Sequence, residues 1–221
     1  MNRIVAIDGP SGSGKSTIAR AVGDALGLEM LDTGAMYRAV AYGVMHSGTD
    51  ASDADAVASI ARAATIVVDR GVTTFDGADI SAAIRGPEVT SLVSVVAAYP
   101  AVRAELVARQ RAWVAANDGG VVEGRDIGSV VFPDARVKVF LTASDEERAR
   151  RRQQDETAAS RAVSVQVVQA TMAVRDAADS NRSVSPLRTA EGATIVDTTG
   201  RTPEEIVAEI VEAFRTAEGA Q

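Results

Sequence analysis

The stretch GPSGSGKST, residues 9–17, decides how the whole chain is interpreted. From Gly9 to Ser16 it fits the pattern G-x-x-x-x-G-K-[ST] without a mismatch. A short β-branched run at 3–8 comes before it, and apolar residues in helical spacing at 16–26 come after it. This order of strand, glycine-rich loop and helix is the context in which the pattern binds nucleotide phosphates. We therefore predict a phosphate-binding loop that follows a buried parallel strand.

Each part of this loop has a predicted task. The glycines let the backbone turn so that successive N–H groups point at a phosphate, and the start of the next helix adds its positive end. Lys15 would bridge the β- and γ-phosphates, and the Ser16 hydroxyl would bind Mg²⁺. The predicted ATP-binding residues of the loop are Gly9, Pro10, Ser11, Gly12, Ser13, Gly14, Lys15, Ser16 and Thr17.

The composition limits the class of protein. With 221 residues, the chain is long enough for one well-buried core and short for two full domains. The net charge of −7 argues against non-specific binding to a nucleic-acid polymer, and the absence of cysteine excludes disulfides and thiolate metal sites. Because the N-terminal residues are typical of a strand followed by a phosphate loop, we expect no signal peptide, and no apolar run approaches the ~20 residues that cross a bilayer. We expect a cytoplasmic monomer that does not bind membranes.

The basic residues are almost all arginines. Of the 23 Lys and Arg residues, only Lys15 and Lys138 are lysines. This bias is typical of a GC-rich genome, and it also suits a site that binds phosphates through bidentate guanidinium groups; the two explanations are compatible. The one histidine, His46, lacks the partners of a catalytic triad or a zinc site, so we interpret it as a surface residue.

Predicted strands and helices alternate along most of the chain, which indicates an α/β fold with a parallel sheet and helices on both faces. The predicted strands are 3–8, 28–31, 121–123, 137–141 and 194–196; the predicted helices are 16–26, 33–46, 53–64, 101–116, one that starts at a capping box at 144–147, 163–178 and 202–217. The exception is 64–80, where short β-prone runs alternate with Arg-Gly and Asp-Gly turns. This pattern predicts an antiparallel meander, which we interpret, with the residues up to about 96, as an insert.

The length and the position of the loop are typical of a kinase for a small acceptor. A GTPase would need Asn-Lys-x-Asp to read its base, and the sequence contains no such tetrapeptide. If the acceptor is itself a phosphate, positive charge must converge between two polyanions. Arginines that could supply it are Arg38, Arg85, Arg103, Arg125, Arg175 and Arg182. Arg125 is the best placed, because it ends a predicted strand, where α/β sheets bind their ligands.

Four segments together resemble bacterial cytidylate kinases, in the nucleoside monophosphate kinase family. They are GPSGSGKST at 9–17, LDTGAMYRA at 31–39, VVEGRDIGSVVFPDA at 121–135 and SNRSVSPL at 180–187. The resemblance implies a single P-loop domain with a parallel five-stranded sheet, a small antiparallel insert and a short lid. It places the core at about 1–32, 97–145 and 183–221, the monophosphate-binding part at about 33–96 and the lid at about 146–182. The implied reaction is phosphoryl transfer from ATP to CMP or dCMP, with Mg²⁺ as cofactor.

The resemblance also implies roles for individual residues at matching positions. Those expected to face the CMP phosphate are Thr33, Tyr37, Arg38 and Arg125, with Arg182 also near the phosphates. Those expected to read the cytosine are Ser94, Arg103 and Asp126, and those expected to hold the ribose are Arg175 and Asp179. The lid arginines expected to close over ATP are Arg148, Arg151 and Arg152, and which of them reach the phosphates stays open. The expected catalytic residues are Lys15, Arg38, Arg125 and Arg182. Thr33 departs from the serine of many relatives and keeps the hydroxyl.

The chemistry of the base agrees with these assignments. Cytosine offers an amino donor at position 4 and acceptors at N3 and O2, which match Asp126 or Ser94 and Arg103, respectively. Uracil reverses the pattern at positions 3 and 4, so that Asp126 would face a carbonyl oxygen. A buried carboxylate without a donor costs several kcal/mol in order of magnitude, which is enough for selection.

Two other functions remain open at this point. One is a kinase for a different small acceptor, such as shikimate or another nucleotide. The other is a regulatory module that binds ATP without an acceptor, which slow ATP turnover independent of any acceptor would favour. The segment at 31–39 and the insert weigh against the first, and the arginines at the strand end and in the lid weigh against the second.

Overall fold

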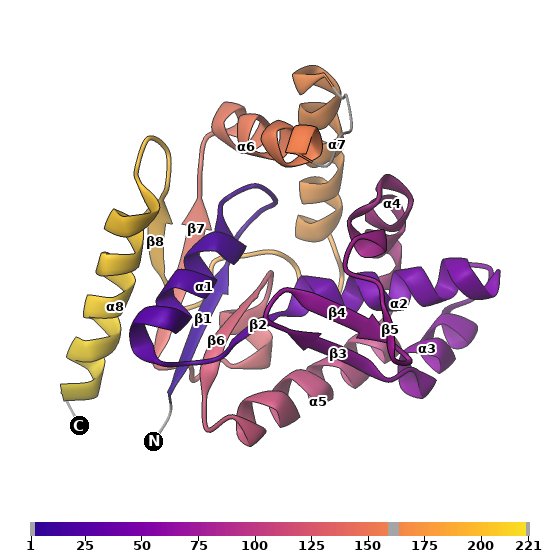
Figure 1. The fold of residues 1–221 in the computed structure, drawn as a ribbon, viewed down its shortest axis with the longest axis horizontal. Helices are drawn as coiled ribbons and strands as arrows, with labels where there is room; N and C mark the ends of the chain where they lie inside the picture. Colours follow the sequence, from indigo (N-terminus) through magenta and orange to yellow (C-terminus); the bar gives the residue numbers. More distant parts are fainter. Residues whose placement is uncertain (1–2, 159–163, 220–221) are drawn as a thin grey trace. The chain divides into compact units, whose positions relative to one another are not determined.

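A computed structural model describes residues 3–158 and 164–219 of the chain (Figure 1). Contacts divide it into two compact units, one of Met1–Glu29 with Val121–Gln221 and the other of Met30–Gly120. We describe each unit by itself. The division into core, monophosphate-binding part and lid stays a prediction.

The main sheet has five strands in the order β2-β6-β1-β7-β8. Their bounds are Ile4–Asp8 (β1), Met30–Asp32 (β2), Gly120–Gly124 (β6), Val137–Thr142 (β7) and Thr194–Asp197 (β8). β7 pairs in parallel with β1 on one side and with β8 on the other. The interior of β1 is fully buried, as expected for an unbroken apolar run at the centre of a parallel sheet. The predicted α/β fold with a five-stranded parallel sheet is confirmed.

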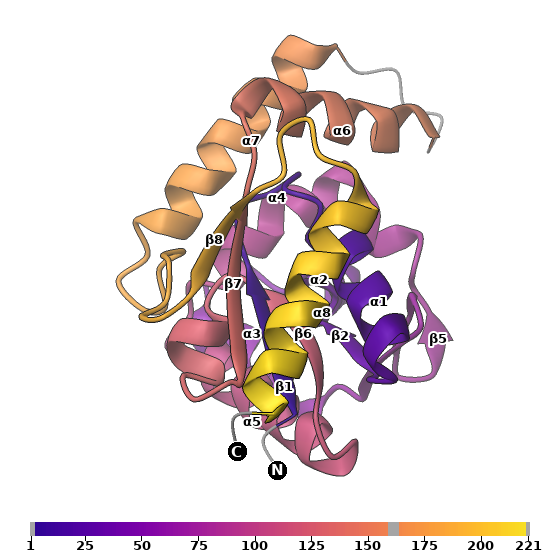
Figure 2. The ribbon, with the colours of Figure 1, turned by 90° about the vertical axis from the view of Figure 1, so that its left-hand side faces the viewer.

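The helices of the first unit are α1 (Lys15–Leu26), α6 (Asp145–Ala158), α7 (Val165–Ser180) and α8 (Pro203–Gly219). α1 and α8 pack against each other on one face of the sheet (Figure 2). α8 begins at a complete capping box: the Thr202 N–H donates to the Glu205 carboxylate at 3.0 Å, and the Glu205 N–H donates to the Thr202 hydroxyl at 3.3 Å.

The capping box predicted for α6 forms only in half. The Ser144 hydroxyl accepts the Glu147 N–H at 3.2 Å, as expected. The Glu147 carboxylate, however, pairs with Arg150 and Arg151, and the Ser144 N–H donates to the Thr199 hydroxyl. The nearby guanidinium groups bind the carboxylate in place of the backbone, and the Arg150 hydrogen bond, with Arg151, lowers the pKa of Glu147 to about 2.

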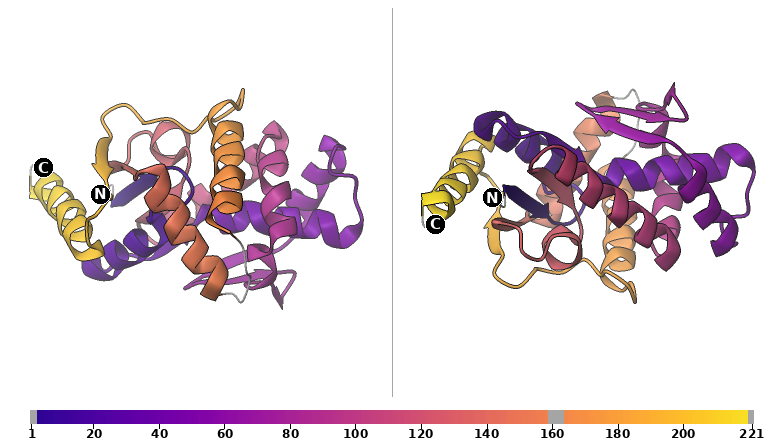
Figure 3. Two further views of the ribbon diagram at one scale, coloured as in Figure 1. Left: turned by 90° about the horizontal axis from the view of Figure 1, so that it is seen from above. Right: turned by 90° about the horizontal axis from the view of Figure 1, so that it is seen from below.

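The second unit holds the predicted meander together with four helices (Figure 3). The bounds of its elements are α2 (Thr33–Ser47), α3 (Ala54–Ala63), β3 (Ile66–Asp69), β4 (Val72–Phe75), β5 (Ala78–Asp79), a 3₁₀ turn (Ala83–Arg85), α4 (Pro87–Val96) and α5 (Pro100–Ala116). β3, β4 and β5 form an antiparallel sheet, which confirms the meander. Both turns, Arg70-Gly71 and Asp76-Gly77, have positive φ at both residues, the geometry of tight hairpins.

Two elements differ from the sequence-based expectation. α4 was not predicted as a helix, because valines dominate it and β-branched residues favour strands; the proline at its first position is the signal that indicates a helix start. A π-helical turn at Ile127–Val131 follows β6 and was also not predicted. π-Helical turns often lie at functional sites, and this one comes directly after Arg125 and Asp126.

No single described helix is long and apolar enough to cross a membrane. One bent pair, Pro87–Val96 with Pro100–Ala116, meets the length and composition criteria.

Candidate active site

The phosphate loop links β1 to α1 and is shaped by its glycines (Figure 1). Gly12 and Gly14 have φ of 76° and 88°, in the left-handed region that side chains disfavour. A Cβ on Gly9 would lie 2.1 Å from the carbonyl oxygen of Leu141 in β7, so no side chain fits there. The loop therefore keeps its backbone N–H groups close to whatever binds inside it.

Lys15 is buried at the start of α1 and folds back over the loop. Its Nζ donates to the Pro10 carbonyl oxygen at 2.7 Å. Burial, followed by the positive charges of Arg125 and Arg175, lowers the pKa of Lys15, while Glu123 and Asp8 oppose the shift. The positive charges of Arg125 and Arg175 thus disfavour the protonated form of Lys15, and an anion bound beside Lys15 would favour that form.

Asp8 ends β1 directly before the loop and is 3% exposed. Its two carboxylate oxygens accept the N–H groups of Ile127 and Gly128, both at 2.8 Å. Burial raises the pKa of Asp8 to about 6, although these two hydrogen bonds lower it; Asp126 adds to the rise, and Lys15 opposes it.

The pH dependence of stability tests this burial of Asp8. Because the pKa is about 6 in the folded protein and 3.8 ordinarily, the folded state binds the proton more tightly between these values. The Asp8 contribution to the free energy of unfolding therefore falls by about 3 kcal/mol as the pH rises from about 4 to about 6. We expect urea titrations to show this fall in the wild type and to lack it in Asp8→Asn. The same pH dependence in both proteins would contradict the assignment.

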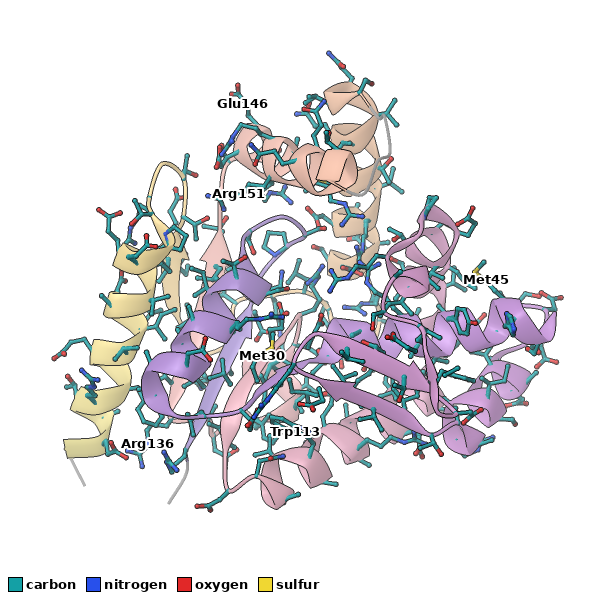
Figure 4. The ribbon with its side chains drawn as sticks, in the orientation of Figure 1. Met30, Met45, Trp113, Arg136, Glu146 and Arg151 are labelled. Atoms are coloured by element: carbon teal, nitrogen blue, oxygen red, sulfur yellow. The ribbon has the colours of Figure 1, made fainter. Side chains whose placement is uncertain are left out.

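Two of the lid arginines contact the phosphate loop and its surroundings from α6. Arg148 donates to the Ser11 carbonyl oxygen at 3.0 Å and pairs with Asp176 of α7, which also accepts the Ser11 N–H at 3.2 Å. Arg151 lies on the side of α6 that faces the loop, opposite Glu146 (Figure 4). It donates to the hydroxyl and carbonyl oxygens of Thr198 at 2.8 and 2.9 Å.

In the first unit, a second set of predicted residues lies between the end of β6 and α7. The Arg125 Nε donates to the Asp179 carboxylate at 3.0 Å. The next residue in the sequence, Asp126, is buried. The Arg182 Nε donates to the Asp179 carbonyl oxygen at 3.3 Å. Arg175 lies on α7, as Asp179 does, and its positive charge helps to lower the pKa of Lys15. The structure therefore brings Arg125, Asp179 and Arg182 together.

In the second unit, Tyr37 and Arg103 contact each other, whereas Arg38, the sequence neighbour of Tyr37, bonds to other residues. The Arg103 guanidinium lies 5.3 Å from the centre of the Tyr37 ring, a cation–π contact, and donates to the Ala97 carbonyl oxygen. Arg38 donates to the Thr90 hydroxyl at 2.9 Å and to the Ile84 carbonyl oxygen. Thr33 is buried at the start of α2, and Ser94 lies on α4.

Sequence reasoning missed four side chains that contact this machinery: Asp8, Thr90, Asp176 and Thr198. Asp8 has a visible signal, since it is the acidic residue at the end of a buried strand, immediately before the loop. Asp176 follows Arg175 on a predicted helix, where an acidic residue is ordinarily solvent-exposed. Thr90 and Thr198 have no signal beyond their polarity.

A divalent cation has one predicted protein ligand here, the Ser16 hydroxyl. Ser16 is an exposed residue at the start of α1. Within the described ranges, no group of three or more His, Asp or Glu side chains could hold a metal ion. A single hydroxyl fits Mg²⁺ in this class of site, because Mg²⁺ keeps several waters and takes its other ligands from phosphates.

The chain is similar in sequence to known cytidylate kinases. The family model described as cytidylate kinase matches residues 5–216. A cytidylate kinase of Mycobacterium avium (strain 104) is 49% identical over 208 residues, which cover 92% of this chain and 91% of that protein. A cytidylate kinase of Desulfitobacterium hafniense (strain Y51) is 48% identical over 217 residues, which cover 96% of this chain and 93% of that protein.

Solved structures share the fold at low sequence identity. An uncharacterized protein from Eubacterium ventriosum ATCC 27560 has a TM-score of 0.56 at 11% identity, with 98% of this chain and 99% of that chain covered. A gluconokinase from Sinorhizobium meliloti 1021 has a TM-score of 0.51 at 16% identity, with 99% and 95% covered. These structures support the fold alone. The sequence matches extend over nearly the whole chain and show that it belongs to the cytidylate kinase family.

Proposed function

We propose that this protein transfers the γ-phosphoryl group of ATP to CMP or dCMP, giving ADP and CDP or dCDP. Membership of the cytidylate kinase family makes it an ATP-dependent phosphotransferase that acts on CMP. The observation that carries the finer proposal is the group after β6, where Arg125 pairs with Asp179 and Arg182 bonds to the backbone of the same residue. A module that only binds ATP would not need arginines in addition to the cations that bind the ATP phosphates.

In this proposal the chain positions two phosphates and neutralises their charge. The loop N–H groups and Lys15 bind the β- and γ-phosphates of ATP, and Arg148 and Arg151 bind from the lid and exclude water. Arg38, Arg125 and Arg182 bind the CMP phosphate, with Thr33 and Tyr37. Mg²⁺, held by Ser16 and phosphate oxygens, would add charge neutralisation. The CMP phosphate is already an anionic nucleophile, so direct in-line transfer needs no covalent intermediate.

The choice of base follows from the donors and acceptors around cytosine. Asp126 and Ser94 accept from the 4-amino group, and Arg103 donates to N3 and O2. Arg175 and Asp179 hold the ribose. Because Asp126 is 4% exposed, a uracil carbonyl in place of the amino group would leave its carboxylate buried against an acceptor.

A coupled assay of ADP release with Mg·ATP tests this function. The acceptor panel is CMP, dCMP, UMP, AMP, GMP and shikimate, with an EDTA-treated control for the metal. We expect strong turnover with CMP and dCMP, and at least about 100-fold lower kcat/KM with UMP. Equal rates with UMP would overturn the account of base choice. No acceptor-dependent rate at all would favour the regulatory module, and a preference for shikimate would favour a different acceptor class.

The cytoplasmic location and the monomeric state also belong to this proposal. They rest on the composition and on the lack of an extended exposed apolar stripe in the sequence. Light scattering at assay concentrations would test the monomer directly.

A further inference from the structure

The Asp8 carboxylate has no role in the proposed transfer, yet it connects two segments that each have one. Asp8 lies immediately before Gly9, the first residue of the phosphate loop. The two N–H groups that it accepts belong to Ile127 and Gly128, which come directly after Arg125 and Asp126. A single buried side chain thus links the strand that carries the ATP site to the backbone that carries two CMP-binding residues.

We infer that Asp8 is a positioning residue for the acceptor, and that it holds the backbone at 125–128 so that Arg125 and Asp126 are directed at CMP. This inference rests on the proposed contacts of those two residues with CMP. It gives Asp8 no contact with either nucleotide.

The geometry of the 125–128 backbone supports this role. Asp126 has φ of −143° and ψ of 23°, outside helical geometry, and the π-helical turn begins at the next residue. The first N–H groups of any helical turn lack partners inside it, so an external acceptor decides where the turn begins. Asp8 supplies that acceptor for two successive N–H groups through charge-assisted hydrogen bonds.

The segment that Asp8 holds also packs closely at Gly128. A Cβ on Gly128 would lie 3.2 Å from the aliphatic stem of Lys138 and 3.3 Å from the Ala190 Cβ. A side chain at this position would require the Lys138 stem or Ala190 to shift, so the segment packs against both neighbours as glycine. The Asp8 hydrogen bonds hold the N–H groups of the same segment, directly after Arg125 and Asp126.

The variant Asp8→Asn tests the inference. The amide keeps the size of the side chain but has one acceptor oxygen, so its NH₂ group would face one of the two N–H donors. We expect the KM for CMP to rise about 10- to 100-fold, while the KM for ATP and the affinity for ADP change less than about threefold. A merely structural role would lower the apparent kcat through loss of folded protein and leave both KM values unchanged; that result would overturn the inference.

The matched control is Asp53→Asn, the same substitution at another cap. The Asp53 carboxylate also accepts two successive N–H groups, those of Asp55 and Ala56 at 3.1 and 3.0 Å, at the start of α3. Asp53 is exposed and lies in the second unit. Both bonds go to one oxygen, which asparagine keeps, so Asp53→Asn removes the charge without removing the cap. We expect it to leave the KM for CMP unchanged; an equal rise there would make the effect a general cost of losing a capping charge and overturn the inference.

Two further variants separate this inference from the proposed function. Asp126→Asn should raise the KM for CMP if Asp126 contacts the base, and an unchanged value overturns both proposals. If Asp126→Asn raises the KM and Asp8→Asn does not, only the role of Asp8 is wrong. If Asp8→Asn fails to fold by circular dichroism, Asp8→Glu takes its place: it keeps the charge on a side chain one methylene longer, which displaces the turn. An unchanged KM for CMP in Asp8→Glu would overturn the inference.

Discussion

Replacing Lys15 by methionine is expected to lower kcat with CMP by about 10³-fold or more, with little loss of folded protein. The side chain is buried, and its ammonium group is the one lysine charge at the loop. Methionine keeps the aliphatic stem and removes the charge that would neutralise the phosphoryl group in flight. Because Lys15 in the free protein carries the cost of burial among Arg125 and Arg175, its loss should leave thermal stability equal or higher.

The chain offers a matched control in its second lysine. Lys138 donates to the Pro133 carbonyl oxygen at 2.9 Å, and its stem packs near Gly128. Lys138→Met keeps that packing and should leave kcat within about twofold of the wild type. Steady-state rates at saturating CMP and ATP measure both variants. A Lys15→Met enzyme with more than a tenth of the wild-type kcat would exclude the proposed role of Lys15.

The second large effect is expected from Arg125→Met, which should lower kcat/KM for CMP by about 10²- to 10³-fold. The substitution removes two things at once: the positive charge proposed to bind the CMP phosphate, and the 3.0 Å ion pair with Asp179. The Asp179 side chain, which is 6% exposed, would be left as a buried charge without this partner. We therefore also expect a lower unfolding temperature, which bound CMP should not restore.

Arg136→Met is the control for Arg125→Met. Arg136 lies in the same unit, and its guanidinium packs 5.4 Å from the centre of the Phe214 ring in α8, which carries none of the proposed acceptor residues. Methionine can keep contact with the ring, so kcat/KM should stay within about twofold. The affinity of both variants for ADP, measured by calorimetry, should match the wild type. If Arg125→Met weakened ADP as much as CMP, Arg125 would belong to the ATP side of the site.

The lid was predictable as an arginine-rich helix but not in its contacts. Helical spacing puts Arg148, Arg151 and Arg152 on one face of the helix, but it does not say which groups that face meets, so the sequence alone leaves their targets open. In the structure, Arg148 reaches Ser11 and Asp176, and Arg151 reaches Thr198. These partners lie 28 to 137 positions away along the chain. Which arginine meets which partner depends on how α6, α7 and the loop after β8 return to the same place.

The helix α4 shows that local propensity alone can assign the wrong secondary structure. Its valines favour a strand by propensity, and packing against α2 within the same unit makes it a helix. That helix supplies Thr90 to Arg38, a contact that could not be expected while 87–96 was assigned to an irregular insert.

The sequence by itself determined the features that depend on neighbouring residues. The phosphate loop, the alternation of strands and helices, the meander and the helix starts at Thr202 and Thr33 each follow from short-range spacing, turn residues and caps. Only the tertiary structure decided which distant groups satisfy the buried polar ones. Asp8 accepts from residues 119 and 120 positions away, and Arg125 pairs with a carboxylate 54 positions away. The physical reason is that burial removes water as a partner, so each polar group must bind what the folded chain brings beside it.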